Sequence, residues 1–387
     1  PCLAFVQLNR DGITKESTDA VSGSDRLIWL CTSFSIFKLK SVEELAEFLK
    51  SNDFPAFRAK QVLEWIWKKN VGSFEEMRNI GKDLQKFLAQ NFTIDKIVLK
   101  DQQVSKDKTI KCAFEIDNKS VVEGVLIPTR QRMTACISSQ VGCSLACTFC
   151  ATGRLKLLRN LSAGEIYDQV FHLKNEAFNR HEKSLSNIVY MGMGEPLLNY
   201  KNVLSSINWI CSEEGLAMSP KRITVSTAGI TKMIKKLGDD EVKFNLALSL
   251  HAANDAKRNK IMEINESNNL ESLKEALIYF YEKTNSRVTF EYIIFDGFND
   301  ELSDASELAD FAKCVPCKIN IIEYNPIDGE PFKQAAPEKV DEFAAFLESR
   351  NMIVNVRRSR GKDIDAACGQ LANKNKAISL EERSLKT

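Results

Sequence analysis

Seven short runs of apolar residues recur from residue 132 onward, and stretches with helical spacing separate most of them. The strand-like runs are RMTACIS, NIVYMGMG, RITVST, FNLALSLH, VTFEYIIF, KINIIEYN and IVNVRRS. The helix-like stretches include residues 163–179, 202–212 and 270–283. Alternation of this kind is typical of parallel strands joined by crossover helices. The pattern therefore predicts an α/β fold over residues 132–370, as a barrel or an open sheet.

The preceding part of the chain has a different pattern. Residues 39–98 carry helical signals: SVEELAEFLKS opens with a capping box, and FRAKQVLEWIWKKN has apolar residues at helical spacing. Residues 99–131 form a predicted linker, in which residues 103–128 alternate like a β-hairpin. Residues 1–38 show no clear period and are predicted to be a poorly ordered extension, and residues 371–387 a C-terminal tail. The sequence thus predicts a small helical domain ahead of the barrel.

Composition limits the class of protein and its surroundings. Apolar content of 44% and charged content of 27% are those of a soluble globular protein. The formal net charge of +1 leaves any nucleic-acid surface to a local basic patch. No apolar run approaches the roughly 20 residues that span a bilayer. Eleven cysteines, an odd number, without a secretion signal favour reduced thiols, so we expect a cytoplasmic protein away from membranes.

The densest chemical signal is CISSQVGCSLACTFCATG, residues 136–153. Cys143, Cys147 and Cys150 follow a CxxxCxxC spacing, and Cys136 stands seven residues ahead of them. Three thiols from one loop suit a cubane iron–sulfur cluster with one iron left open. Structural zinc usually takes four ligands from paired hooks, and Cys136 remains an alternative fourth ligand.

Polar groups follow five of the predicted strands. They are the cysteine loop, Gly194-Glu195-Pro196, Ser226-Thr227, Ser249-Leu250-His251 and Asn325-Pro326. Barrel enzymes build their active sites from the loops at the carboxyl ends of the strands. The sequence therefore predicts that these groups share one active site.

Six motifs carry a resemblance to a known family. SSQVGCSLACTFCATG, MGMGEPLLN, RITVST, SLHA, YNP and DIDAACGQL occur in the order found in the RlmN/Cfr family of radical S-adenosylmethionine (SAM) RNA adenosine methyltransferases. The similarity covers residues 41–372, and the helical segment corresponds to the family's accessory domain. The resemblance implies a partial (βα)6 TIM-like barrel. GEPLLN looks more like the RlmN branch, which methylates C2 of adenosine, than the Cfr branch, which methylates C8.

The resemblance also implies a role for each thiol. Cys143, Cys147 and Cys150 would hold one 4Fe–4S cluster, whose open iron binds SAM. Cys368 would carry a methyl group from a first SAM, and a second SAM would supply the radical that activates it. Cys136 would release the covalent RNA intermediate by forming a transient disulfide bond with Cys368.

Other positions match the family's base and its SAM contacts. Glu123 resembles the base that takes the C2 proton, although the residues alone favour a solvated strand glutamate. Glu195 would accept hydrogen bonds from the SAM ammonium group. The family's SAM-contacting positions correspond to Gly194, Glu195, Ser226, Ser249, Leu250, His251 and Asn325.

The implied activity is formation of 2-methyladenosine at the peptidyl-transferase centre of 23S rRNA, with tRNA next to the anticodon as a second candidate substrate. We expect a monomer that receives electrons from a donor such as flavodoxin. RNA contacts are predicted at Arg357–Lys362 and at Arg154, Lys156 and Arg159. The alternatives are a Cfr-type C8 methyltransferase and a zinc-stabilised RNA-binding protein without catalysis.

Overall fold

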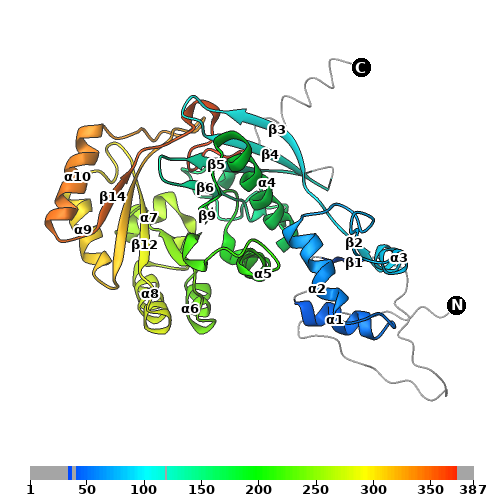
Figure 1. Cartoon of the computed structure of the whole chain (residues 1–387). Coiled ribbons are helices and arrows are strands. Elements are labelled where there is room, and N and C mark those ends of the chain that lie inside the picture. The colour runs from blue at the N-terminus through cyan, green and yellow to red at the C-terminus, as the bar shows by residue number, and fades with distance from the viewer. Residues whose placement is uncertain (1–33, 37–40, 118–119, 373–387) are drawn as a thin grey trace.

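A ten-stranded sheet forms the centre of the molecule (Figure 1). The structure is a computed structural model that describes residues 34–36, 41–117 and 120–372. Seven neighbouring strands of the sheet run parallel to one another. They are β6 (Met133–Cys136), β9 (Asn187–Tyr190), β10 (Ile223–Thr227), β11 (Asn245–Ser249), β12 (Val288–Ile294), β13 (Cys317–Glu323) and β14 (Val354–Arg357). These strands are the seven predicted runs, so the α/β prediction is confirmed.

Helices connect these strands and surround the sheet (Figure 1). They are α4 (Ala163–His181), α5 (Tyr200–Cys211), α6 (Thr231–Asp239), α7 (Asp255–Ile261), α8 (Leu270–Thr284), α9 (Leu302–Ala312) and α10 (Pro337–Ser349). Each of the six parallel strands before β14 (β6 and β9 to β13) is followed by one or two helices, which gives six βα units. Strand β14 is an edge strand, so the parallel strands do not close into a full barrel. The predicted partial (βα)6 barrel is confirmed.

Three antiparallel strands extend the sheet beyond β6. They are β3 (Val98–Val104), β4 (Ile110–Ile116) and β5 (Ser120–Pro128). The hairpin predicted over residues 103–128 is the β4–β5 pair, and β3 is a further strand that the hairpin prediction lacked. All seven residues of β3 are exposed or half-buried, which hid the period-two signal from the sequence.

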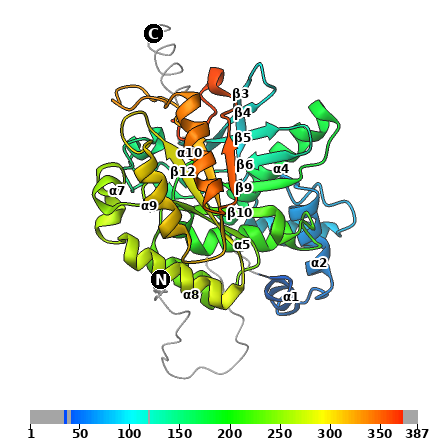
Figure 2. The same ribbon diagram turned by 90° about the vertical axis from the view of Figure 1, so that its left-hand side faces the viewer.

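Helices also form most of the segment before β3. They are α1 (Val42–Lys50), α2 (Arg58–Leu63), the π-helix Glu64–Lys68 and α3 (Lys82–Asn91), and Ser41 caps α1 as predicted. Figure 2 shows α1 and α2 beside one side of the barrel. The Trp67 ring stacks on Trp209 of α5 at a centroid distance of 4.7 Å, and Lys96 forms a 2.9 Å ion pair with Asp168 of α4. These contacts hold the helical segment against the barrel.

The two edges of the long sheet are tied together near the carboxyl end of β14. Ser105, in the turn between β3 and β4, donates from Oγ to Asp363 Oδ1 at 2.5 Å. The backbone N–H of Gly361 donates to Asp107 Oδ2 at 3.0 Å. This latch joins the first strand of the sheet to the segment that follows its last strand.

Some predictions fall on parts of the chain outside the described residues. Of the predicted N-terminal extension, only residues 34–36 are described, and a two-residue strand there pairs with Phe92–Thr93. Of the predicted tail, residues 371–372 are described. No helix of the described residues is both long and apolar enough to span a bilayer.

Candidate active site

A cavity of about 850 Å³ lies inside the barrel. Its volume is within the range of small-molecule sites. Its lining includes the predicted site residues Cys136, Cys143, Cys147, Cys150, Gly194, Glu195, Ser226, Ser249, His251 and Cys368. Leu250, Asn325 and Glu123 lie behind this lining rather than in it. The fold therefore brings together side chains from positions more than two hundred residues apart in the sequence.

Two glycines allow the tight path of the cysteine loop. A Cβ atom at Gly142, whose φ is 78°, would lie 2.2 Å from a carbonyl oxygen across the loop. A Cβ at Gly153 would lie 2.7 Å from another carbonyl oxygen. Strands β7 (Gln140–Val141) and β8 (Arg159–Asn160) pair across the base of the loop. A larger residue at either glycine would force the backbone apart.

The three thiols of this loop share one buried site. Burial raises the pKa of Cys143 to about 11 and also raises the pKa values of Cys147 and Cys150. The thiolates of Cys143 and Cys150 raise the pKa of Cys147 further. Such thiols ionise only beside strong positive charge, which a metal centre provides. Together they suit a metal-containing ligand.

The spacing of these thiols bears on the kind of metal centre. Among the described residues, no group of three or more His, Cys, Asp and Glu converges closely enough to hold one metal ion. Thiolates around a single zinc lie roughly 4 Å from one another, since each Zn–S bond is about 2.3 Å. Thiolates of a cubane instead bind separate irons. Three thiols from one loop match the number of protein ligands of a cubane with one open iron.

Glu195 places a buried carboxylate beside the thiols. Its Oε1 accepts from the backbone N–H of Leu197 at 3.0 Å, and its Oε2 accepts from that of Ala228 at 2.8 Å. Burial raises its pKa to about 7, so a cationic ligand would stabilise the ionised form. At Gly194, where φ is 94°, a Cβ would lie 2.4 Å from the Gln140 side chain. Only glycine allows this close approach.

Arg258 was not among the residues predicted from the sequence, yet it organises two loops of the site. Its guanidinium donates to the carbonyl oxygens of Ala228 at 2.6 Å, Leu250 at 3.0 Å and Ser249 at 3.3 Å. Burial lowers its pKa to about 10. Leu250 thus takes part through its carbonyl, while its side chain is buried. No sequence signal marks Arg258, because the helix DAKRNKI looks solvent-facing.

Three polar side chains form another part of the wall. The Ser226 and Ser249 hydroxyls are 3.3 Å apart. His251 has a left-handed backbone (φ 56°), and its Nδ1 accepts from the backbone N–H of Ile293 at 3.1 Å. The ring also makes an edge-on contact with Phe149, at a centroid distance of 4.7 Å. Burial lowers the pKa of His251 to about 3, so the ring is neutral.

The segment around Cys368 lies directly on the cysteine loop. The carbonyl of Gly369 accepts from the backbone N–H of Ala151 at 2.7 Å, and Thr152 Oγ1 donates to the Leu371 carbonyl at 2.6 Å. The Cys368 side chain is exposed to the cavity, but the protein around it still raises its pKa to about 11. This carrier segment, residues 366–372, covers the carboxyl end of the barrel.

Asn325 connects β13 to the carrier segment. Its Nδ2 donates to the Cys368 carbonyl at 3.3 Å. Its Oδ1 is buried without a hydrogen-bond partner among the described residues. Buried polar atoms are normally paired, so this oxygen has an unused acceptor position behind the cavity wall.

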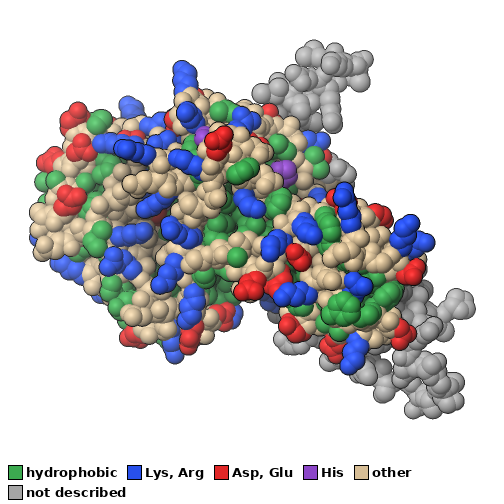
Figure 3. Space-filling view, viewed as in Figure 1, with side chains coloured by type: hydrophobic (Ala, Val, Ile, Leu, Met, Phe, Trp, Pro, Cys, Tyr) green, Lys and Arg blue, Asp and Glu red, His purple; other side chains and the backbone are tan. Residues whose placement is uncertain are grey.

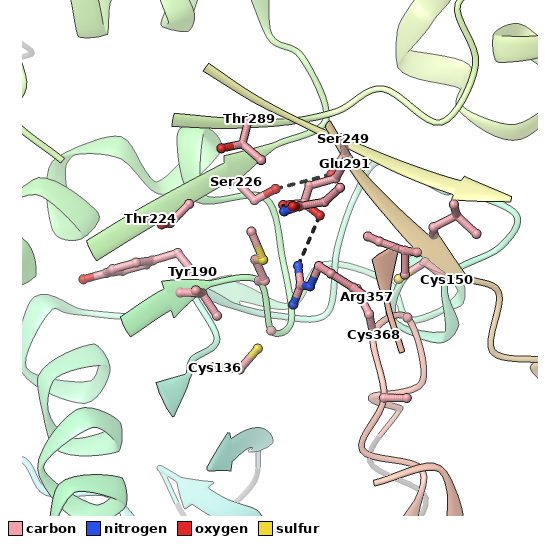
Figure 4. Close-up of a pocket in the computed structure, with 18 of the residues that line it drawn as sticks. Cys136, Cys150, Tyr190, Thr224, Ser226, Ser249, Thr289, Glu291, Arg357 and Cys368 are labelled. Atoms are coloured by element: carbon pink, nitrogen blue, oxygen red, sulfur yellow. Dashed lines mark hydrogen bonds and ion pairs between the residues drawn. The ribbon is translucent and has the colours of Figure 1, made fainter. Parts of the chain in front are cut away.

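Cys136 and Cys368 face a shared cation. In Figure 4 the Arg357 side chain lies between the two labelled cysteines, with its guanidinium toward Glu291. Arg357 Nη1 is 3.1 Å from Glu291 Oε2, and Glu291 Oε1 accepts from Asn320 at 2.8 Å. Burial and, to a smaller extent, the Cys368 thiolate raise the pKa of Cys136 to about 12, and Arg357 opposes both. Both thiols line the same cavity.

Glu123 lies beside the cavity, in β5. Its carboxylate is 3.5 Å from Lys111 Nζ and accepts from the backbone N–H of Ala372 at 2.9 Å. In this arrangement it holds the end of the carrier segment. Its role as the base for the C2 proton stays a prediction.

Most of the basic residues expected to contact RNA have carboxylate partners. The ion pairs join Arg154 to Glu330, Arg159 to Asp117 and Glu165, Arg357 to Glu291, Arg358 to Glu323 and Asp341, and Lys362 to Glu323. Lys156 and Arg360 are exposed. Paired cations offer little net charge to a phosphate, and Arg357 faces the cavity instead of an RNA surface.

The described cysteines are all free thiols. They are Cys112, Cys136, Cys143, Cys147, Cys150, Cys211, Cys314, Cys317 and Cys368. The predicted disulfide bond is therefore not supported by the structure, and it remains only as a transient step of the chemistry that the resemblance implies.

Comparison with known proteins gives the family. The family model described as "Ribosomal RNA large subunit methyltransferase N-terminal domain" matches residues 38–94, and the model described as "Radical SAM superfamily" matches residues 137–311. A probable dual-specificity RNA methyltransferase RlmN of Cytophaga hutchinsonii is 58% identical over 334 residues, which cover 86% of this chain and 92% of that protein. The chain belongs to the RlmN family.

Two further relatives agree with this assignment. The dual-specificity RNA methyltransferase RlmN of Campylobacter fetus subsp. fetus is 41% identical over 349 residues, which cover 87% of this chain and 97% of that protein. The crystal structure of a radical SAM methyltransferase from Sphaerobacter thermophilus superposes with a TM-score of 0.82 and 36% identity. That alignment covers 87% of this chain and 99% of the other. The RlmN-family fold thus extends over nearly all of the described residues.

Membership of the radical SAM superfamily implies a 4Fe–4S cluster and SAM, and this site fits both groups. The thiols of Cys143, Cys147 and Cys150 meet in one buried loop without forming a site for a single ion. The buried Glu195 carboxylate and the unpaired Asn325 Oδ1 complement a ligand with an ammonium group and other donors. The RlmN-family site therefore has suitable partners for both groups.

Proposed function

We propose that this chain is a radical SAM RNA methyltransferase that forms 2-methyladenosine in 23S rRNA and in tRNA next to the anticodon. The dual-specificity names of its RlmN relatives and the match of residues 38–94 to a ribosomal RNA methyltransferase domain support the proposal. The observation that carries it is the meeting of the three loop thiols, Cys136 and Cys368 in one cavity. The C8 alternative would use the same thiols, and the RlmN names of the relatives favour the C2 reaction over it.

In this proposal Cys143, Cys147 and Cys150 hold the cluster, and Glu195 orients SAM through its ammonium group. When bound, the cluster supplies the electron that cleaves SAM to a radical able to take hydrogen from a methyl group. Ser226, Ser249, His251 and Asn325 complete the SAM contacts, with Gly194 and Leu250 contributing backbone. The buried wall keeps water away from the reacting atoms.

Cys368 and Cys136 act in sequence on the transferred carbon. The Cys368 thiolate takes a methyl group from one SAM, and a second SAM activates that group, so each turnover uses two. After the carbon has joined C2, the adduct gives up one electron, which the cluster would accept when bound, and Glu123 takes the C2 proton. The Cys136 thiolate then attacks the Cys368 sulfur. An S–S bond forms, the S–C bond breaks with its electron pair on the transferred carbon, and that carbon takes up a proton to become the methyl group.

The proposal includes an external electron donor such as flavodoxin, which also returns the disulfide to two thiols. It further includes a cytoplasmic monomer, with a helical domain over residues 39–98 and a radical SAM barrel over residues 132–370. The electron donor, the location and the monomeric state are proposed from the family assignment and not from the geometry of the site.

Mass spectrometry of nucleosides tests the proposal. 23S rRNA and tRNA are digested from cells with and without the protein. We expect 2-methyladenosine to disappear from both RNAs when the protein is absent. Appearance of 8-methyladenosine in its place in the complemented cells would instead support the Cfr-type alternative.

A further inference from the structure

Four exposed cations lie at the opposite end of the barrel from the cysteine loop. Arg132 directly precedes β6, Lys221 and Arg222 directly precede β10, and Lys318 is the second residue of β13. All four line the same cavity as the thiols. Because parallel strands begin at one end of a barrel, these amino-end cations share one face of the molecule. Lys and Arg side chains gather around a hollow on the face seen in Figure 3.

The amino-end cations differ from most of the basic residues near the cysteine loop in one respect. No ion pair joins any of the four to a carboxylate within the described chain, whereas Arg154, Arg159 and Arg358 each have at least one such pair. Near the cysteine loop, the exposed Lys156 and Arg360 are the exceptions among the described residues. The acidic residues of the cavity lining are Glu195 and Glu291, which are both buried. The positive charge at this end is therefore available to a polyanion.

The two ends of the barrel also differ in how they are covered. The carboxyl end carries the cysteine loop and the carrier segment, which are bonded to each other. The amino end is lined by side chains of the strands and of the segments before them, among them Asn187, Asn245 and Asn355. Amide groups can hydrogen-bond the edges of an unpaired base.

We propose that the amino-end cations, Arg132, Lys221, Arg222 and Lys318, bind the backbone phosphates on either side of the target adenosine, and that the adenosine enters the cavity from this end. The inference rests on the proposed function and adds to it the face on which RNA docks. Phosphate contacts position the RNA, while the asparagines inside the mouth meet the base. A base must leave its stack to reach a cavity of this kind.

An acidic protein such as an electron donor is the other polyanion that this charge could attract. RNA is favoured because the cations surround a cavity that leads to the thiols, and a reductant needs no opening of that kind. Binding of the electron donor at this face is therefore the alternative that the test must exclude.

The test compares the anaerobically reconstituted holoenzyme with two double variants, Lys221→Gln/Arg222→Gln and Arg132→Gln/Lys318→Gln. Binding of a fluorescein-labelled RNA stem–loop with adenosine in its loop is followed by anisotropy over a series of salt concentrations. Each lost phosphate contact lowers the slope of log Kd against log salt by roughly 0.7 to 0.9, so each double variant should lower it by roughly 1.4 to 1.8. The Kd should rise about tenfold at physiological salt.

The matched control is Lys232→Gln/Lys274→Gln, which removes two exposed lysines from the outer helices α6 and α8. It should bind RNA like the unsubstituted enzyme. Cluster absorbance and SAM binding should be unchanged in every variant, since none of the altered side chains is among the proposed contacts of the cluster or of SAM.

The possible outcomes separate this inference from the proposed function. If the unsubstituted enzyme methylates no RNA, the proposed function fails first. If the unsubstituted enzyme methylates RNA, and both double variants bind RNA with the same Kd and salt slope as that enzyme, the amino-end cations do not form the RNA-docking face. If the variants bind RNA normally but are reduced slowly by flavodoxin and normally by dithionite, the face belongs to the electron donor and the inference is overturned.

Discussion

The carboxyl and amino ends of the barrel are built by different means. At the carboxyl end, backbone hydrogen bonds and glycines without room for a Cβ fix the cysteine loop, and the buried Arg258 holds two neighbouring loops of the site. At the amino end, exposed cations extend from the strand starts without carboxylate partners among the described residues. Chemistry needs atoms at fixed positions, whereas attraction of a large polyanion needs only uncompensated charge. Variants at the two ends should therefore fail in different ways.

The largest effect is expected from Cys368→Ala at the carboxyl end. In the proposed function this sulfur carries the methyl group, so methyl transfer to RNA should fall below detection. The three thiols proposed to hold the cluster are untouched, so cluster absorbance and slow SAM cleavage should remain. Methylation assays with radiolabelled SAM, together with 5′-deoxyadenosine analysis, measure both. Normal methyl transfer would remove the carrier role from Cys368.

Cys136→Ala should block a later step. The carbon–sulfur bond between RNA and Cys368 would form but not break, and the protein should accumulate with RNA covalently attached. Denaturing gels with labelled RNA detect this species. The control is Cys211→Ala, a half-buried cysteine of α5 that does not line the cavity. Free, fully methylated RNA from the Cys136→Ala enzyme would assign release to another residue.

Glu195→Gln should weaken SAM binding without preventing cluster assembly. The variant keeps the shape of the side chain but loses the charge, and a hydrogen bond to a charged group contributes about 1.5 to 3 kcal/mol. The Kd for SAM should therefore rise roughly tenfold to a hundredfold, as measured by equilibrium dialysis. RNA affinity should not change, because Glu195 is far from the amino-end cations in the barrel. A loss of RNA binding equal to that of SAM would show that the two ends are not independent.

The smallest effect is expected from Ser105→Ala in the latch between the sheet edges. The variant loses the hydroxyl that donates to Asp363, and this bond lowers the pKa of Asp363. A lowered carboxylate pKa stabilises the fold above the ordinary value of about 3.9, and the contribution is lost as the pH falls through the lowered pKa. The melting temperature should drop by roughly 1 to 2 °C at pH 7, with a smaller difference at a pH of about 2 to 3, below the ordinary pKa of the carboxyl. An equal difference at both pH values would exclude the Asp363 contact as its cause.

The strands and the thiols could be predicted from the sequence because each rests on a local signal. Parallel strands buried on both faces read as continuous apolar runs, and all seven residues of β12 are buried. The cysteine loop carries its three thiols within eight residues. In contrast, β3 is hardly buried, so its residues carry no periodic apolar pattern.

Other parts of the site depend on contacts that only the folded chain creates. Arg258 reaches carbonyls of two neighbouring loops, and nothing in its helix distinguishes it from a surface arginine. Glu291 is one charge within an apolar strand, and its partner Arg357 lies 66 residues away, in the stretch predicted to contact RNA. The amino-end cations come from three strand starts, where single basic residues are common. These residues lie on one face only because of the order of the strands in the sheet.

His251 limits which groups of a ligand can form a hydrogen bond with this part of the cavity wall. Because Nδ1 already accepts a bond from Ile293, the single proton of the neutral ring resides on Nε2. The imidazole can therefore give a hydrogen bond to a ligand but cannot take a proton from it anywhere near neutral pH. A molecule seated against this wall must present an acceptor there, so the ring selects ligands by polarity and leaves proton transfer to other groups.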